Sequence, residues 1–329
     1  MYDIITIGSA TRDVYLESNE LQVIKDKKFK TGRGLCMPEG SKVNVENIFF
    51  TTGGSAVNTA VTFAQQGFST ATLCKVGEDF GGEVIEQRLH DTGVSTELIT
   101  IDEEHQTAYS VVVHSPSGER SIFVYRGATS HLNLKNIDFS FLKNTKWIYI
   151  THLGQESAQI FEPLLKEANK NSVKIVLNPG ETQLKMGKNL VPFLNYADIL
   201  FVNQEEASYL TGVSFDKEEK LFEKLDKWVK GIAVMTKGPK GIIASDGKYR
   251  WKAGIVKEPR FVDRTGAGDA FGSGFTSAIM RGGTVEDAIQ LGSTNSASVL
   301  GEWGANSGLL TREDAMDKFG LLDIKKSKL

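Results

Sequence analysis

Cysteine, long apolar runs and excess charge are all scarce in this sequence. Two cysteines, Cys36 and Cys74, exclude a disulfide framework and a zinc site of four thiolates, and they suggest a reducing compartment. No run of about 18 apolar residues occurs, so no membrane-spanning helix is expected. A net charge of −3 provides no field that would attract nucleic acid or an anionic membrane. The chain begins with a strand-like segment rather than a leader, and we expect a cytoplasmic protein.

Two common phosphate-binding motifs are also absent. No Gly-x-x-x-x-Gly-Lys-Ser/Thr string occurs, which disfavours a P-loop kinase. Neither of the two glycine clusters follows the first strand with Gly-x-Gly-x-x-Gly spacing, which disfavours a dinucleotide-dependent oxidoreductase. An anionic substrate must therefore be held by local groups, such as helix N-termini and a metal ion.

Short apolar segments alternate with helical segments along most of the 329 residues. The predicted strands are 4–7, 71–76, 147–150, 174–177, 199–202 and 232–235. The predicted helices are 56–66, 79–91, 156–170, 203–211 and 218–230. This alternation is typical of an α/β fold with a mostly parallel sheet covered by helices on both faces. We expect residues 1–329 to form a single domain.

Two segments interrupt the alternation and read as inserted β structure. Residues 10–50 alternate only weakly, and residues 98–127 read as two strands joined by a turn at 116–119. The two insertions could pair into a small sheet that forms a movable lid over a substrate, or they could extend one edge of the main sheet. The Lys-rich end, 325–328, reads as a solvated tail.

The most informative passage is 263–269, Asp-Arg-Thr-Gly-Ala-Gly-Asp. It follows a β-like run and precedes a helical run of small residues, 270–278. Gly266 and Gly268 let the backbone approach an anion, and the helix would direct free N–H groups at it. Asp269 suits this place if its carboxylate takes a proton from an attacking hydroxyl while the N–H groups hold phosphoryl oxygens. The passage indicates a phosphotransferase, although a first-turn Asp after a Gly-rich turn also stabilises a helix by itself.

A second glycine cluster, 53–60, opens another expected helix. Its paired glycines allow close approach, and Asn58 offers both a donor and acceptors, although a capped helix packed on the sheet would read the same way. The string from 53 to 77 resembles the first signature of the ribokinase family of sugar kinases, which includes the minor phosphofructokinases and adenosine kinase. The 263–269 passage resembles the second signature. Further matches cover essentially the whole chain, at Asp13, 77–81, 203–206 and 236–241.

The resemblance implies a three-layer α/β/α ribokinase-like fold with an inserted β lid, and ATP and Mg²⁺ as cofactors. In this family Asp269 would be the catalytic base, and the anion hole would come from Gly266, Ala267 and Gly268. An acidic residue after the first strand grips substrate hydroxyls, which suits a polyol. The positions that would line the substrate pocket are Asp13, Gly54 and Asn58.

Metal positions are implied in the same way. Asn203 and Glu206 fit the family's Asn-x-x-Glu motif, which helps to place Mg²⁺ largely through water, and they also read as a helix capping box. Asp263 and Thr265 resemble positions that bind a monovalent cation, completed from the loop 301–307, so potassium activation is implied.

Nucleotide contacts are expected along a turn and a later helix. The implied residues are Thr236, Gly238, Gly241 and Asn295. Relatives more often carry a small or β-branched residue where this chain has Arg264. Its cation could contact nucleotide phosphates or point to solvent, and we favour solvent.

These features predict a kinase that uses ATP and Mg²⁺ to phosphorylate a hydroxymethyl group of a sugar. Gly154 stands where ribokinases proper often have Glu, which argues against d-ribose, and His152 reads as structural. The alternative is a nucleoside kinase acting on the ribose 5′-hydroxyl. Its base pocket would need aromatic residues, for which the candidates are Phe29, Phe49, Phe50, Tyr109, Phe123 and Tyr125. A non-catalytic sensor is disfavoured because the base and the anion-hole glycines are present. Exposed lid strands would also support a homodimer.

Overall fold

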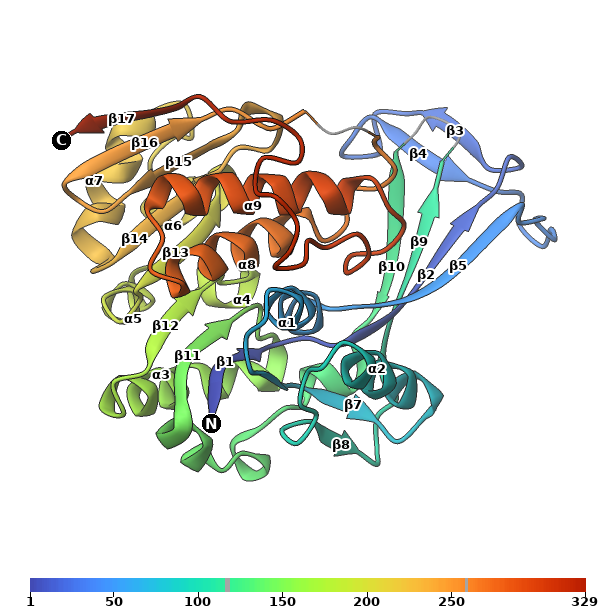
Figure 1. Cartoon of the computed structure of the whole chain (residues 1–329). Helices are drawn as coiled ribbons and strands as arrows, with labels where there is room; N and C mark the ends of the chain where they lie inside the picture. The colour runs from blue at the N-terminus through green and yellow to red at the C-terminus, as the bar shows by residue number, and fades with distance from the viewer. Residues whose placement is uncertain (116–118, 258–259) are drawn as a thin grey trace.

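A nine-stranded sheet forms the centre of the protein in the computed structural model, which describes residues 1–115, 119–257 and 260–329 (Figure 1). The prediction of a mostly parallel sheet is confirmed: the strands from β6 to β14 run parallel, and the last three pair antiparallel. Across the sheet the strands are β17 (Ile324–Lys328), β16 (Tyr249–Ala253), β15 (Ile242–Ser245), β14 (Ile232–Thr236), β13 (Ile199–Asn203), β12 (Lys174–Leu177), β11 (Thr145–Ile150), β1 (Tyr2–Ile7) and β6 (Thr70–Leu73).

Helices cover both faces of this sheet and give the protein three layers (Figure 1). Apolar residues of α3, α6 and α7 pack on one face, and those of α1, α8 and α9 pack on the other. The central strands are therefore buried on both faces, as their continuous apolar runs require. The helices are α1 (Ser55–Gln65), α2 (Phe80–Asp91), α3 (Phe161–Lys170), α4 (Glu181–Leu184), α5 (Val191–Leu194), α6 (Gln204–Thr211), α7 (Glu218–Trp228), α8 (Ala267–Met280) and α9 (Val285–Leu300). Among the described residues, no helix is long and apolar enough to cross a membrane.

The two interrupting segments form a separate sheet, here called the small sheet, which projects from one end of the main body (Figure 1). Its order is β10-β9-β2-β5, so both segments contribute strands and neither extends the edge of the main sheet. The expected turn at 116–119 falls largely outside the described residues. The strands are β2 (Thr11–Glu17), β5 (Asn47–Gly53), β9 (Ala108–His114) and β10 (Arg120–Tyr125). Two short pairs belong to neither sheet, β3 (Gln22–Lys25) with β4 (Arg33–Cys36), and β7 (Lys75–Gly77) with β8 (Thr100–Asp102).

An aromatic cluster and an ion pair are among the contacts that hold the small sheet against the main body. Trp303, in the loop after α9, packs on Phe49, Tyr15 and His114, with ring centroids 4.9, 5.7 and 4.9 Å apart. Arg120 donates to the Oδ1 of Asp263 at 3.1 Å. An aromatic cluster and a buried carboxylate therefore connect this sheet to the loops before α8 and after α9.

Three local predictions are wrong. The 71–76 run is not one strand, because β6 ends at Leu73 and β7 pairs with β8 outside the main sheet. The residues just before 263 form no strand where they are described, since β16 already ends at Ala253. The Lys-rich end is the edge strand β17, in which Lys326 lies over the rings of Tyr249 and Trp251 at 4.8 and 5.0 Å. Such cation–π contacts let a charged segment cover an apolar edge.

Candidate active site

The N-terminus of α8 lies between two cavities. Gly266 precedes the helix with φ +80°, and a Cβ there would come within 2.5 Å of the Ala305 carbonyl oxygen, so this turn requires glycine. The backbone N–H groups of Gly268 and Asp269 have no hydrogen-bond partner among the described residues. Ala267 and Gly268 line the larger cavity, whereas Gly266 and Asp269 line the smaller one. The positive end of α8 and its free N–H groups are thus available to both cavities.

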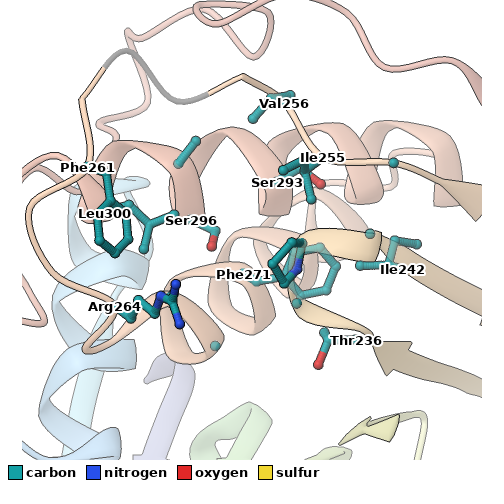
Figure 2. A pocket seen from close by; sticks show the side chains of 17 residues that line it. Thr236, Ile242, Ile255, Val256, Phe261, Arg264, Phe271, Ser293, Ser296 and Leu300 are labelled. Carbon is teal, nitrogen blue, oxygen red and sulfur yellow. The ribbon is translucent and has the colours of Figure 1, made fainter. Parts of the chain in front are cut away.

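The larger cavity has a volume of about 400 Å³ and mostly apolar walls (Figure 2). Phe271 of α8, Leu300 of α9 and Ile242 of β15 contribute to these walls, and Ser293 and Ser296 of α9 add hydroxyl groups. An apolar slot beside a helix N-terminus can hold the base of a nucleotide while the phosphates meet the N–H groups.

Three of the residues expected at the nucleotide, Thr236, Gly238 and Gly241, line this larger cavity. Gly241 has φ +86°, and a Cβ there would lie 2.0 Å from the carbonyl oxygen of Ala253. The turn after β14 therefore depends on glycine to keep its backbone at the cavity wall.

Asn295 lies away from its expected place, whereas Arg264 lies at the cavity edge. Asn295 is completely buried: its Nδ2 donates to the carbonyl of Ala270, its Oδ1 accepts from the N–H of Leu310, both at 2.8 Å, and it does not line the cavity. Because both ends of this amide join parts of the protein, the structure does not place Asn295 in contact with the cavity expected to hold a nucleotide. Arg264 is exposed, as favoured from the sequence, and it also lines the larger cavity with its guanidinium 5.3 Å from the centre of the Phe261 ring (Figure 2).

The smaller cavity, of about 230 Å³, lies where the small sheet meets the first turns of α1 and α8. Thr11 and Asp13 of β2 line it together because side chains two residues apart on a strand share a face. Ser110 of β9 is the register partner of Asp13 and lines it as well. Gly54 and Asn58 complete the expected substrate group. All three residues that the sequence proposed for the substrate therefore line the cavity that contains Asp269.

Asp269 is held by α1. The Nδ2 of Asn58 donates to the Oδ2 of Asp269 at 2.8 Å, and Asn306 in turn donates to the Oδ1 of Asn58 at 3.2 Å. Burial raises the pKa of the Asp269 carboxyl, while hydrogen bonds from Asn58 and Ser55 act against that rise. A fixed carboxylate with a raised pKa accepts a proton more readily, so this group can serve as a general base toward a hydroxyl in the cavity.

Asp13 is buried, and its carboxylate fits only because residue 53 is a glycine. Thr11 donates to its Oδ1 at 3.0 Å, and a Cβ on Gly53 would lie only 1.9 Å from its Oδ2. Burial raises the pKa of Asp13, and hydrogen bonds from Thr11 and Ser110 oppose this. Gly54 has φ +89°, and a Cβ there would approach the β1–β2 turn within 2.4 Å. This close approach brings the start of α1 to the cavity that Asp13 lines.

Asn203 and Glu206 form the capping box that the sequence allowed. The Oδ1 of Asn203 accepts from the N–H of Glu206, and the Oε2 of Glu206 accepts from the N–H of Asn203, both at 2.8 Å. Burial raises the pKa of Glu206. Neither residue lines the two cavities, and no group of three His, Cys, Asp or Glu suited to a metal occurs in the described chain. A sparse site of this kind fits Mg²⁺, which keeps several waters and binds substrate phosphates.

Asp263 and Thr265 leave buried oxygens that suit a small cation. Asp263 accepts at Oδ1 from Arg120 and from the N–H of Arg264, whereas its Oδ2 and the Thr265 hydroxyl are buried with no hydrogen-bond partner in the part of the chain that is described. Buried unpartnered oxygens are costly unless something binds them. These residues therefore fit a monovalent cation.

Sequence reasoning missed most of the remaining cavity residues. In the larger cavity these are Ile255, Val256, Phe261, Ser293, Ser296 and Leu300. In the smaller cavity they are Ser9, Thr11, Ser110, Val124, Arg126 and Thr129, whereas Tyr125 is one of the aromatic candidates from the sequence. Strand alternation from Asp13 could have found Thr11, and the 3–4 spacing on α9 could have found the serines and Leu300. The loop residues have no periodic signal.

The fold and the site define a class: a phosphotransferase in which two cavities meet at a helix N-terminus. The family model described as pfkB family carbohydrate kinase matches residues 1–312, and the chain belongs to this family. It is therefore an ATP-dependent kinase that acts on an alcohol group.

Individual relatives span both sugar and nucleoside kinases. The chain is 28% identical over 283 residues to the ribokinase of Haemophilus influenzae, covering 84% of this chain and 90% of that protein. It is 27% identical over 273 residues to the cytidine kinase of Thermococcus kodakarensis, covering 82% and 93%. The solved ribokinase of Arabidopsis thaliana, complexed with ribose and ATP, superposes with a TM-score of 0.78 at 23% identity, covering 95% and 96%. That likeness shows the ribokinase fold.

Proposed function

We propose that this enzyme transfers the γ-phosphoryl group of ATP to a hydroxymethyl group of a sugar. The observation that carries the proposal is the N-terminus of α8, which contributes to the walls of both cavities and has Asp269 on the acceptor side. ATP would place its base in the larger cavity and its phosphates toward Ala267 and Gly268. The sugar would occupy the smaller cavity.

The residues then divide the chemistry between them. The acceptor oxygen attacks the γ-phosphorus, the bond from phosphorus to the β–γ bridging oxygen breaks, and Asp269 takes the hydroxyl proton. The N–H groups of Gly266, Ala267 and Gly268 stabilise the charge on the phosphoryl oxygens. Asn58 keeps the Asp269 carboxylate in place, and hydroxyls elsewhere on the sugar donate to Asp13.

The aromatic content of the acceptor cavity favours a sugar over a nucleoside. Of the six aromatic candidates for a base pocket, only Tyr125 lines the smaller cavity. Phe49 instead stacks on Trp303, and Phe50 is exposed and faces Arg12. A nucleoside base would have few flat apolar surfaces to cover it. Nucleoside phosphorylation remains the second candidate because of the likeness to the cytidine kinase.

An acceptor panel tests this proposal. Neutral sugars, sugar acids, sugar phosphates, adenosine, inosine and cytidine would each be incubated with ATP, Mg²⁺ and the enzyme, and ADP release would be measured. We expect a sugar or sugar derivative to give the highest kcat/KM. A nucleoside as the best acceptor would replace the proposal with the second candidate.

Magnesium, when bound, would screen the phosphate charges, and we propose that Glu206 helps to hold it through water. Glu206→Gln keeps an oxygen that can accept from the N–H of Asn203, so the cap and the free energy of unfolding should change little. The magnesium concentration for half-maximal rate should rise about 10-fold or more, because outer-shell groups of a metal typically contribute 10- to 100-fold in affinity. Magnesium titrations and urea unfolding measure the two effects.

Thr284→Ala is the matched control for this experiment, because Thr284 forms a capping box with Asp287 at the start of α9 and lines neither cavity. It removes the side-chain cap and should cost about 1 kcal/mol of stability. An unchanged magnesium requirement in Glu206→Gln would remove Glu206 from the metal site and leave it as a capping residue.

We also propose that K⁺ binds at Asp263 and Thr265 and raises the rate. Exchange of K⁺ for Na⁺ in the assay should lower kcat, and equal rates in both salts would count against this site.

The small sheet would act as the lid that excludes water, and it also offers a dimer surface. Its edge strands expose apolar side chains, at Ile48 and Phe50 on β5 and at Ile122, Phe123 and Val124 on β10. We propose that two copies pair through this sheet. Sedimentation at micromolar concentration should give dimers, and monomers alone would refute the pairing. We also propose that the enzyme is cytoplasmic.

A further inference from the structure

The acceptor cavity contains a cation that the chemistry above does not use. Arg126 follows β10 and is the only Lys or Arg among the described residues that line this cavity. Its position is fixed by the next residue: Gly127 has φ +45°, and a Cβ there would lie 2.1 Å from the carbonyl oxygen of Gln106, which also accepts from the N–H of Ala128 at 2.8 Å. The guanidinium is therefore attached to a rigid point of the cavity wall.

The Arg126 side chain is exposed and makes no hydrogen bond or ion pair with any described residue. The nearby Glu181 is already paired with Lys185, whose Nζ lies 2.7 Å from the Glu181 Oε1. This hydrogen bond lowers the pKa of Glu181, and Arg126 adds a smaller contribution. His152, on the same side, adds no negative charge, and burial lowers its pKa, with a further contribution from Arg126. The guanidinium is thus available to an anion inside the cavity.

The two acids of the cavity restrict where such an anion can bind. Asp269 and Asp13 would repel a negative group placed beside them, whereas they suit hydroxyls. A guanidinium presents paired N–H donors that match a carboxylate or a phosphate with two parallel hydrogen bonds. The charges of the cavity therefore suit a molecule with hydroxyls at the acids and an anionic group at Arg126.

We propose that the acceptor is a sugar that carries a negatively charged group, a carboxylate or a phosphate, and that Arg126 binds this group and orients the hydroxymethyl group toward Asp269. The inference rests on the proposed sugar kinase activity and specifies its substrate class. Arg126 is then a specificity-determining residue.

Matched acceptor pairs test the proposal. Fructose would be compared with fructose 6-phosphate, ribose with ribose 1-phosphate, and 2-deoxyribose with 2-keto-3-deoxygluconate, in the wild type, Arg126→Gln and Arg126→Lys. We expect one anionic acceptor to exceed its neutral partner about 100-fold in kcat/KM, as one charge-assisted pair of hydrogen bonds allows. Arg126→Gln should lose about this factor, mostly in KM, with partial recovery in Arg126→Lys. The phosphate and carboxylate members of the panel identify the anion.

Arg33→Gln is the matched control, because Arg33 is an exposed arginine of the β4 strand and lines neither cavity. Its kinetics should equal those of the wild type. A wild type that prefers neutral sugars, together with an unchanged kcat/KM in Arg126→Gln, overturns the inference and leaves the proposed kinase activity intact.

A binding measurement separates the two claims if no acceptor turns over. Titration calorimetry of Asp269→Asn with each acceptor measures binding without chemistry, and the double variant with Arg126→Gln measures the contribution of the arginine. Loss of binding for the anionic sugar alone supports the inference, and equal binding in both variants overturns it. Thermal unfolding of each variant confirms that the fold is retained.

Discussion

Asp269→Asn should lower kcat by about 10²- to 10⁴-fold, the usual contribution of a general base. Asparagine has the same shape and can still accept the hydrogen bond that Asn58 donates at 2.8 Å, so the cavity should stay intact. What is lost is the group that takes the acceptor proton. KM for ATP and for the sugar should change little, because the interaction is made in the transition state. Steady-state kinetics with both substrates varied will measure this.

The raised pKa of Asp269 leads to two further expectations, one for the wild type and one for the variant. Below its pKa the base is protonated, so the acidic limb of the wild-type kcat profile should lie at higher pH than an ordinary aspartate would give. A carboxyl whose pKa is raised by folding stabilises the protein below its unfolded-state pKa and loses that contribution as pH rises through the folded-state pKa. The ionised group therefore costs stability at neutral pH, and Asp269→Asn should melt at a higher temperature than the wild type. A variant with near-normal kcat would exclude Asp269 as the base.

Gly266→Ala should lose both stability and activity. An alanine at φ +80° costs roughly 1–2 kcal/mol, and its Cβ would also press on the Ala305 backbone, which lies 2.5 Å away. Relief of that contact must move the turn that presents the first N–H groups of α8. Loss of one such donor costs about 10²- to 10³-fold in kcat, and we expect a loss of at least this size. Urea unfolding and steady-state kinetics measure the two effects.

Gly268→Ala is the comparison that separates the effect on stability from the effect on phosphate binding. A Cβ at Gly268 meets no atom within 4 Å and would enter the larger cavity, so the fold should be as stable as the wild type while phosphate binding suffers. Gly266→Ala should therefore unfold more easily than Gly268→Ala. Full turnover by Gly266→Ala would show that this turn does not hold the phosphoryl group.

The parts of the site that the sequence predicted all carry strong local constraints. Gly266 and Gly54 adopt positive φ angles at close backbone contacts, which only glycine tolerates well, so their presence in the sequence already specified two special turns. Asp269 and Asn58 occupy the first turns of two helices that the small-residue pattern revealed. The alternation of apolar and helical runs likewise predicted the parallel sheet, because each run must be buried on both faces.

The parts that the sequence did not predict depend on partners distant in the chain. Asn295 looks like a ligand contact in isolation, and only the carbonyl of Ala270 and the N–H of Leu310 reveal its internal role. The edge strand β17 reads as a charged tail, because its pairing with β16 and the contacts of Lys326 with Tyr249 and Trp251 involve residues about 75 positions earlier. Arg126 gives no periodic signal, since its place in the cavity is fixed by the loop around Gly127.

The glycines inside α8 have a consequence for engineering. Alanine at a helical glycine ordinarily gains about 1 kcal/mol, which makes it a routine choice for raising thermal tolerance. At Gly272 a Cβ would sit 2.2 Å from the Tyr149 hydroxyl, and at Gly274 it would sit 3.1 Å from Gly292 of α9. Helix α8 can therefore pack this closely only because these positions lack side chains. Alanine at either position would push α8, and with it the catalytic N-terminus, away from Tyr149 and α9.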